Sequence, residues 1–253
     1  LSPADLAMHV ALPEVDGRIG AGVISFKDTA PLDPDLQFSR AAHAPAAERI
    51  AATVARVAAW TRLATLLPQE KRVALVLSTY PGKAHRMAHA VGLDALASAE
   101  AMLEDLADAG HVVEPGPPLE QALTETIAWP LANYRAALET LPEALRDNLL
   151  ATCGAAEDDP AVTRGAFTFA ATRRGKVLVA LQPERSRDRD REGEYHDTSR
   201  VPCHAYVAFY LWLRSQVDAL VHIGAHGTLE WLPGKAAALS GSCWPESLAG
   251  PLP

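Results

Sequence analysis

Apolar residues along the chain form short continuous runs and longer stretches with helical spacing. Each short run is bounded by polar or turn residues, which is the pattern of buried strands. The run Val73–Leu77 has no polar interruption, as expected for a central parallel strand that is covered on both faces. On this basis we predict strands at 71–77, 167–170, 176–181 and 219–223.

Three stretches carry the helical pattern. The Ala-rich segment 44–66 has its large apolar residues three and four positions apart, which predicts a surface helix packed on the sheet with Trp60 in the core. A second helix is predicted at 98–109, ended by Gly110. A third is predicted at 205–215.

Other segments are assigned from their turn residues. Residues 6–12 and 20–26 are predicted to be strands around a charged turn, and His111–Val113 is predicted to begin a strand that completes a βαβ unit. Residues 118–151 are predicted to be helical, with breaks at two prolines.

These elements predict an α/β fold: a mostly parallel sheet with flanking helices and a helical insertion. We divide the chain into a strand-rich N-terminal segment (1–42), a βαβ unit (43–117), the helical insertion (118–160) and a second α/β portion (161–253). The chain does not begin with Met and ends at Gly-Pro-Leu-Pro, so we expect it to be a fragment of a larger multidomain subunit.

Composition excludes several classes of protein. Among the 253 residues, 49% are apolar, which indicates a globular chain, and the net charge of −8 argues against a nucleic-acid binder. The three cysteines have no CxxC spacing, which excludes a cysteine-built zinc site and fits the reducing cytoplasm. No apolar run approaches the ~20 residues of a membrane span, and no GxxxxGK[ST] phosphate loop occurs.

The most unusual stretch is Asp218–Lys235. It begins as the predicted strand 219–223 and continues into a polar loop that contains His226 and Glu230. His222, His226 and Glu230 are spaced four apart, but two nearby glycines argue against a helix. In open α/β sheets, ligands bind at the carboxyl ends of the strands, so we predict a binding site here.

Two further segments are predicted to lie near this loop. The loop 78–83 follows the strand 71–77, so in a parallel sheet its Tyr80 and Lys83 leave from the same edge. The mixed-charge run 184–194 is predicted to be an exposed, mobile loop. It leads to His196 and His204, which could face the same cleft as His226.

The segment 222–235, His-Ile-Gly-Ala-His-Gly-Thr-Leu-Glu-Trp-Leu-Pro-Gly-Lys, resembles a signature of the CobN-type large subunit of cobaltochelatase, whose superfamily includes the large subunit of magnesium chelatase. Three other blocks agree with the cobalt branch: 12–18, then 73–82 with 91–94, and 195–197 with 204–214. The block 222–235 is long enough to be specific, and residues 114–165 are the least characteristic.

The resemblance implies an ATP-dependent enzyme that inserts cobalt(II) into hydrogenobyrinic acid a,c-diamide in aerobic cobalamin biosynthesis. Cobalt is then a substrate. ATP with magnesium is expected on a partner AAA+ subunit that works with a third chelatase subunit. A fragment alone is expected to be inactive.

The chemistry of metal insertion assigns roles to individual residues. The inner N–H protons of the ring must leave, and the resemblance makes Glu230 the candidate base, with a structural glutamate as the alternative. Imidazole suits cobalt delivery, so His226 is the first candidate ligand. His222, His196 and His204 are further candidates, although His222 could equally be a core histidine that orients a neighbour.

Holding the ring requires flat apolar surface and cations for its carboxylates. Trp231 could stack on the ring or lie in the core, and Lys235 or Arg18 could pair with carboxylates. Tyr80 is placed in the same group by its loop. His85 and His89 depart from the family pattern, and we interpret them as polar positions at a helix start.

Three alternatives stay open at this point. The chain could belong to a magnesium chelatase that inserts magnesium into protoporphyrin. It could be a stand-alone metal-dependent hydrolase that uses His222, His226 and Glu230. It could also be a non-catalytic scaffold domain that contacts ATPase subunits.

Overall fold

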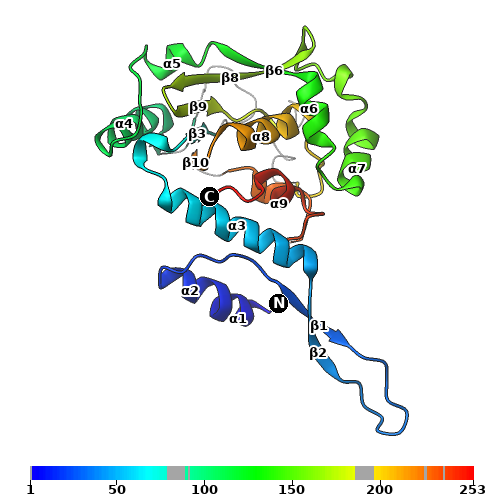
Figure 1. The fold of residues 1–253 in the computed structure, drawn as a ribbon. Helices are drawn as coiled ribbons and strands as arrows, with labels where there is room; N and C mark the ends of the chain where they lie inside the picture. Colours follow the sequence, from blue (N-terminus) through cyan, green and yellow to red (C-terminus); the bar gives the residue numbers. More distant parts are fainter. Residues whose placement is uncertain (1, 79–88, 91, 186–196, 225–226, 236) are drawn as a thin grey trace.

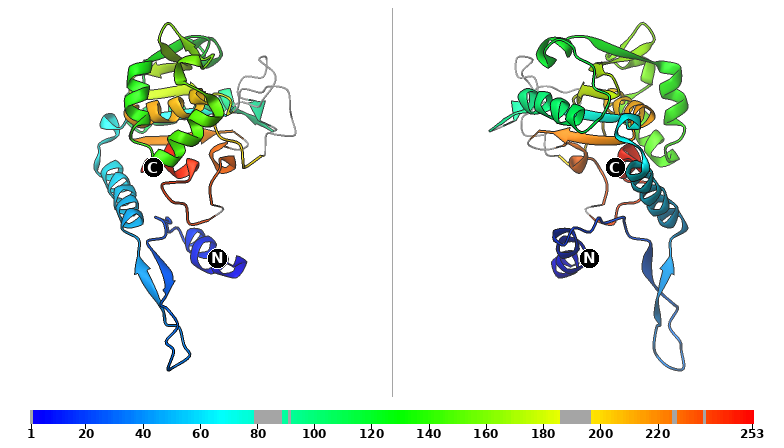
Figure 2. Two further views of the ribbon diagram at one scale, coloured as in Figure 1. Left: turned by 90° about the vertical axis from the view of Figure 1, so that its right-hand side faces the viewer. Right: turned by 60° about the vertical axis from the view of Figure 1, so that its left-hand side comes forward.

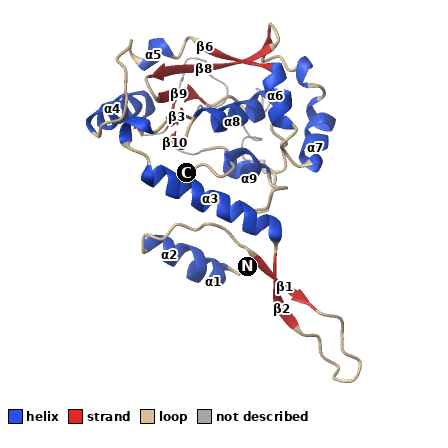
Figure 3. Ribbon diagram, in the orientation of Figure 1, coloured by secondary structure: helices blue, strands red, loops and turns tan. Residues whose placement is uncertain are grey.

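The computed structural model describes residues 2–78, 89–90, 92–185, 197–224, 227–235 and 237–253. A six-stranded sheet lies at its centre, with strand order β10-β3-β9-β8-β6 and β7 paired to β8 (Figures 1 and 3). The strands of this sheet are β3 (Val73–Leu77), β6 (Thr126–Pro130), β7 (Val162–Thr163), β8 (Ala166–Arg174), β9 (Val177–Leu181) and β10 (Ala219–Ile223).

The predicted α/β class is confirmed, and the sheet is mixed. Strands β10, β3 and β9 run parallel, whereas β8, β6 and β7 join the sheet antiparallel. The predicted strands at 71–77, 167–170, 176–181 and 219–223 are all present, with boundaries that differ by a few residues.

Helices cover both faces of the sheet. Because successive side chains of a strand point to opposite faces, Ala74 and Val76 of β3 pack in one cluster with α8, while Leu75 and Leu77 pack in the other with α4. The helices around the sheet are α4 (Ala95–Asp108), α5 (Leu119–Ala122), α6 (Leu131–Leu138), α7 (Glu143–Cys153), α8 (His204–Gln216) and α9 (Trp244–Ala249).

Helix α8 is buried along almost its whole length, from His204 to Leu213. Its aromatic side chains form much of the larger core cluster, in which Phe169 of β8 stacks on Trp212 at 4.9 Å between ring centroids. The predicted helix at 205–215 is therefore confirmed, and it forms the centre of one layer.

The first residues of the chain are helical, so the predicted strand at 6–12 is wrong. They form α1 (Pro3–Leu6), a π-helical turn (Ala7–Ala11) and α2 (Leu12–Val15). Ser2 and Asp5 cap α1 reciprocally, with the Asp5 amide 3.2 Å from Ser2 Oγ and the Ser2 amide 2.9 Å from Asp5 Oδ2. This capping box starts a helix, and a short apolar run does not by itself distinguish helix from strand.

Beyond α2 the chain forms an arm that projects away from the sheet (Figures 1 and 2). The arm is the antiparallel pair β1 (Ser25–Thr29) and β2 (Ala41–Pro45). The predicted strand at 20–26 thus overlaps β1 only at its end.

The long helix α3 (Ala47–Thr65) confirms the helix predicted at 44–66. It lies along the outside of the sheet layers (Figure 2). Trp60 is 40% exposed, so its predicted place in the core is wrong. The apolar stripe of α3 faces outward here, which the spacing of residues cannot reveal.

Two predictions for the middle of the chain also need correction. His111–Val113 forms no strand: the Val112 carbonyl accepts one hydrogen bond from Lys176 at 2.9 Å, and no ladder follows, so the predicted βαβ unit is not formed. The stretch 118–151 contains strand β6 between its helices. Prolines 130 and 142 do mark helix starts, as α6 and α7 begin directly after them.

A small pair, β4 (His89–Ala90) and β5 (Leu93–Asp94), precedes α4, so the helix start predicted near His89 is wrong. Among the described residues, no helix has the length and apolar character needed to cross a bilayer.

Candidate functional site

The three parallel strands end side by side at one edge of the sheet. Ile223 of β10 pairs in register with Leu77 of β3, which pairs with Leu181 of β9. The next residues stay joined: the Ser78 amide donates to the Ile223 carbonyl at 3.0 Å, and the Gln182 amide donates to the Leu77 carbonyl at 2.9 Å. The prediction that the loops after β3 and β10 leave from the same edge is confirmed.

The loop after β10 brings His222 and Glu230 to one point. A Cβ atom placed on Gly227 would lie 3.4 Å from Glu230 Oε2 and 3.7 Å from His222 Nδ1. Glu230 lies in the 3₁₀ turn η5 (Leu229–Trp231) and is exposed, whereas His222 is half-buried. A carboxylate open to solvent and a ring nitrogen thus face the same narrow space beside the Gly227 backbone.

Tyr210 of α8 fixes the other side of the His222 ring. Its hydroxyl lies 2.9 Å from His222 Nε2. Burial raises the pKa of Tyr210 well above its usual value, so the phenol keeps its proton. Burial also lowers the pKa of His222, which favours the neutral imidazole near pH 7. The Tyr210 hydroxyl and His222 Nε2 share this hydrogen bond, and Nδ1 is the ring nitrogen nearest Gly227.

A second set of buried polar groups forms hydrogen bonds with the loop after β10. Tyr206 OH lies 2.6 Å from Thr228 Oγ1, and Gln182 Nε2 donates to Tyr206 OH at 2.9 Å and also to Thr228 Oγ1. Ser78 Oγ lies 3.5 Å from Gln182 Oε1. These hydrogen bonds connect the ends of β3 and β9, helix α8 and the loop into one network.

This network was not predicted from the sequence. Two signals could have indicated it: Gln182 is the first residue after a predicted strand, at the same edge as the loop, and Tyr206 and Tyr210 are four apart on a helix. Polar groups on an otherwise buried helix need partners, so two buried tyrosines on one face predict a polar cluster.

Arg185 is 6% exposed and donates to the Trp231 carbonyl, so the predicted exposure of the run 184–194 is wrong at this residue. Residues 186–194 lie outside the described part. Trp231 is half-buried in η5.

Lys235 ends the loop and is exposed. Its amide donates to Cys243 Sγ at 3.4 Å, and its ammonium lies 6.0 Å from the centre of the Phe26 ring. Before it, Gly234 passes so close to Cys243 that an added Cβ would lie 2.9 Å from Cys243 Cβ. This explains the glycine in Pro-Gly-Lys.

His204 is not placed as a ligand. It is buried, its Nδ1 lies 2.6 Å from Tyr134 OH, and its Nε2 lies 3.0 Å from the Gly154 carbonyl. Both ring nitrogens are thus occupied by protein groups, and we assign His204 a structural role in place of the predicted ligand role.

The remaining predicted ligands cannot be placed together. His196, His226 and Tyr80 lie outside the described residues, as do Lys83 and His85. Within the described ranges, no three His, Cys, Asp or Glu side chains gather as a metal site. Arg18 is exposed after α2, and in the part of the chain that the structure covers no hydrogen bond or ion pair joins its side chain to the loop after β10.

Comparisons with known proteins show to which family the chain belongs. The sequence matches the CobN/Magnesium Chelatase family over residues 1–253. The chain therefore belongs to the CobN/magnesium chelatase family. Within it, the chain is 39% identical to the aerobic cobaltochelatase subunit CobN of Pseudomonas aeruginosa and 38% identical to that of a Sinorhizobium species, each across the whole chain.

A magnesium-chelatase subunit of Rhodobacter capsulatus is more distant, at 29% identity over the whole chain. The solved structure of the catalytic subunit of cobaltochelatase from Mycobacterium tuberculosis superposes with a TM-score of 0.84 at 35% identity, covering 100% of this chain and 23% of that one. The chain spans about a fifth of the length of the curated cobaltochelatase relatives, 21% and 22%.

Proposed function

We propose that this chain forms part of the metal-insertion site of a cobaltochelatase large subunit, with cobalt(II) and hydrogenobyrinic acid a,c-diamide as substrates. One observation carries the proposal: Glu230 and His222 converge at Gly227, at the carboxyl edge of the parallel strands. This edge is where open α/β sheets bind ligands, and the chain aligns along its whole length with cobaltochelatase subunits.

Glu230 is proposed as the base. Metal insertion releases the inner N–H protons of the ring, and a carboxylate within hydrogen-bond reach can accept them. The exposed position of Glu230 allows it to meet a ring that arrives from solvent and to pass protons back to water. His222, held neutral by burial and oriented by Tyr210, would position the carboxylate.

His226 is proposed to deliver cobalt, with His222 as a second nitrogen and His196 as a third. Imidazole binds cobalt and can release it, which suits a transfer site. Trp231, Lys235, Arg18 and Tyr80 stay proposals for holding the ring. The half-buried Trp231 leaves part of its indole surface for stacking.

The proposal places ATP and its magnesium on a partner AAA+ subunit that acts with a third chelatase subunit, in the cytoplasm. The second candidate is a magnesium chelatase, which the 29% identity to the Rhodobacter capsulatus protein keeps open. The higher identity to cobaltochelatase subunits favours cobalt.

The test compares Glu230→Gln with the wild type in the complete polypeptide that carries this chain, together with its ATPase partners. We expect the variant to bind hydrogenobyrinic acid a,c-diamide as well as the wild type does, as measured by the absorbance of the ring. We expect its rate of metal insertion to fall by about 100-fold or more. The exposed Glu104→Gln on α4 is the matched control.

Five results would contradict parts of the proposal. Unchanged insertion by Glu230→Gln would remove its role as base. Lost ring binding would make Glu230 a binding residue. Insertion of magnesium into protoporphyrin, with no cobalt activity, would favour a magnesium chelatase. Turnover by this chain alone would support a stand-alone metal-dependent hydrolase. Binding of the ATPase subunits without any ring affinity would indicate a scaffold domain.

A further inference from the structure

A separate cavity of about 250 Å³ lies between α3, α9 and the turn that joins α6 to α7. None of the residues described above at the carboxyl edge of the sheet lines it. Its walls come from α3, the turn between α6 and α7, the end of α8 and the C-terminal segment: Arg49, Ala52, Ala55, Arg56, Thr140, Leu141, Pro142, Arg214, Gly241, Glu246, Ser247, Gly250 and Pro251.

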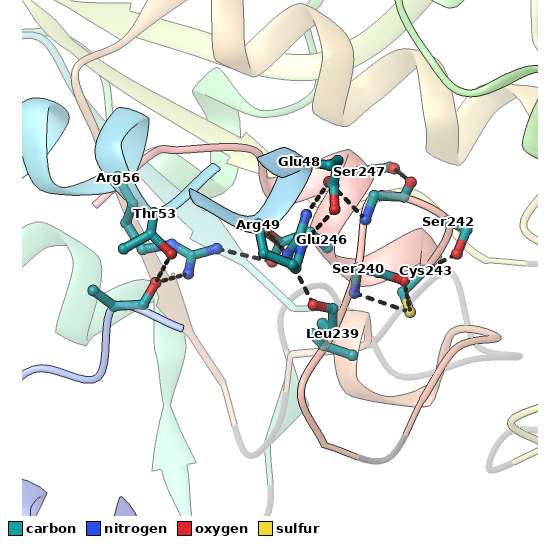
Figure 4. A network of polar contacts seen from close by, with 12 residues as sticks. Glu48, Arg49, Thr53, Arg56, Leu239, Ser240, Ser242, Cys243, Glu246 and Ser247 are labelled. Atoms are coloured by element: carbon teal, nitrogen blue, oxygen red, sulfur yellow. Dashed lines mark hydrogen bonds and ion pairs between the residues drawn. The ribbon is translucent and has the colours of Figure 1, made fainter. Parts of the chain in front are cut away.

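Three guanidinium groups and a single carboxylate face this cavity. Glu246 pairs with Arg49 at 3.1 Å and with Arg56 at 2.8 Å (Figure 4). Glu48 also pairs with Arg49, but it does not line the cavity. Even with both glutamates counted, three arginines leave one positive charge uncompensated.

The uncompensated charge is on Arg214 of α8. Its Nη1 donates to the Ser247 carbonyl at 2.8 Å, and its guanidinium lies so close to Gly250 that an added Cβ would be 2.6 Å from Nε. Within the described residues, no carboxylate forms an ion pair with Arg214. Burial lowers the pKa of Arg214, a sign that the charge is held away from water without an anionic partner.

Burying a charge without a partner is costly, and a planar guanidinium is suited to bind a carboxylate through two parallel hydrogen bonds. We propose that this cavity is a binding site for the carboxylate of a small organic acid, with Arg214 as its main ligand and Arg56 beside it. The cavity has room for the carboxylate arm of such a molecule. A monoanion would neutralise the one excess positive charge, whereas a phosphate dianion would exceed it by one negative charge.

The site is independent of the proposed metal-insertion function, because it shares none of that function's residues. It can be tested by protection of arginine from phenylglyoxal in the complete polypeptide, with modified residues mapped by mass spectrometry. Acetate and propionate are expected to protect Arg214 and Arg56, with less protection by phosphate and by chloride at equal ionic strength. Equal protection by chloride, or none by any anion, would overturn the proposal, and stronger protection by phosphate would overturn its carboxylate preference.

Two variants test the same site by calorimetry with propionate. Arg214→Gln is expected to weaken binding about tenfold or more, because it removes a charge-assisted pair of hydrogen bonds. Arg164→Gln, in an exposed turn, is the matched control and should bind as the wild type does.

Because Arg214→Gln also loses its bond to Ser247, a second variant leaves all three arginines in place. Ala52→Glu on α3 would supply a tethered carboxylate to the cavity. It is expected to raise the melting temperature and to abolish propionate binding. Binding that survives this substitution unchanged would contradict the proposal.

Discussion

Tyr210 is the residue on which the orientation of His222 depends. Its hydroxyl is the hydrogen-bond partner at Nε2, on the side of the ring away from Glu230. We expect Tyr210→Phe to lower the turnover number for metal insertion by about tenfold, as for other residues that orient a functional histidine, with the KM for the ring unchanged.

The matched control is Tyr134→Phe, which removes an equally buried hydroxyl that lies 2.6 Å from His204. Both variants should lose about 1 kcal/mol of unfolding free energy, measured with urea. Only Tyr210→Phe should slow insertion. An equal loss of activity in both would mean that Tyr210 acts only through stability.

The roles of single residues could not be predicted fully from the sequence. His222 could be read as a ligand or as a core histidine, and the structure places it between the two: half-buried, with one nitrogen bound to Tyr210 and the other beside Gly227. His204, which was predicted to face the same cleft, is buried. The difference depends on tertiary partners, which come from segments 12 and 70 residues away.

Asp218 directly precedes strand β10 and joins it to β3 at the end opposite the site. Its side chain is 5% exposed and accepts hydrogen bonds from the Arg72 amide, Nε and Nη2 at 3.0, 3.1 and 2.9 Å. The Arg72 side chain is the main cause that holds the pKa of Asp218 below its usual value of 3.8.

We therefore expect Asp218→Asn to lower the unfolding free energy by about 2 kcal/mol at pH 7, since it removes hydrogen bonds to a charged group. A carboxyl with a lowered folded-state pKa stabilises the fold above its unfolded pKa and loses this contribution as pH falls through the folded value. The difference in unfolding free energy between wild type and variant should thus become smaller below pH 3.8. Urea unfolding at several pH values measures this difference. A gap independent of pH would contradict the ion-pair account.

Two glycines in the loop after β10 are predicted to respond differently to alanine. At Gly227 the added Cβ meets Glu230 and His222 at ordinary contact distances, 3.4 and 3.7 Å, so the fold should tolerate it while the methyl group separates the two side chains. At Gly234 the Cβ would lie 2.9 Å from Cys243 Cβ, so the backbone must shift.

Gly227→Ala should therefore keep the wild-type melting temperature and lower the insertion rate, and Gly234→Ala should lower the melting temperature. Differential scanning calorimetry and the insertion assay separate the two effects. The reverse pattern would mean that the functional space does not lie beside Gly227.

Helices and strands were predicted correctly where the pattern of apolar residues fits only one kind of secondary structure. The continuous apolar run in β3 needs cover on both faces and is buried at every position, and this strand was predicted correctly. The strand prediction for residues 6–12 was wrong because apolar runs of this length fit either a helix or a strand. The capping residues Ser2 and Asp5 favour the helix. Residues 111–113 failed because a β-propensity run without a neighbouring strand forms no ladder.

At the scale of the whole molecule, a large apolar surface is exposed on α3 and the N-terminal arm. Leu36 is 73% exposed and Val54 61%, and Val57, Phe38 and Val15 are also open to solvent. A set of large exposed apolar side chains often marks a surface that another segment or protein covers. The matched relatives carry about four fifths of their length outside this segment, so we expect other parts of such a polypeptide to cover the surface.

The 253-residue chain alone should therefore self-associate at micromolar concentration, measured by light scattering after size exclusion. Val54→Lys with Val57→Lys on α3 should reduce this association. Leu150→Lys, at an exposed position of α7 away from the arm, should not. A monodisperse monomeric wild type would contradict the expectation.

The burial of α8 also bears on how the site comes into existence. Helix α8 is buried along almost its whole length, so it has little solvent-facing surface on which to form by itself. It becomes stable only as the sheet and α6 pack around it. Tyr206 and Tyr210, which hold Thr228 and His222, are carried by this helix. Any opening that frees α8 therefore also releases His222 and the loop, so the candidate site is present only while α8 is packed.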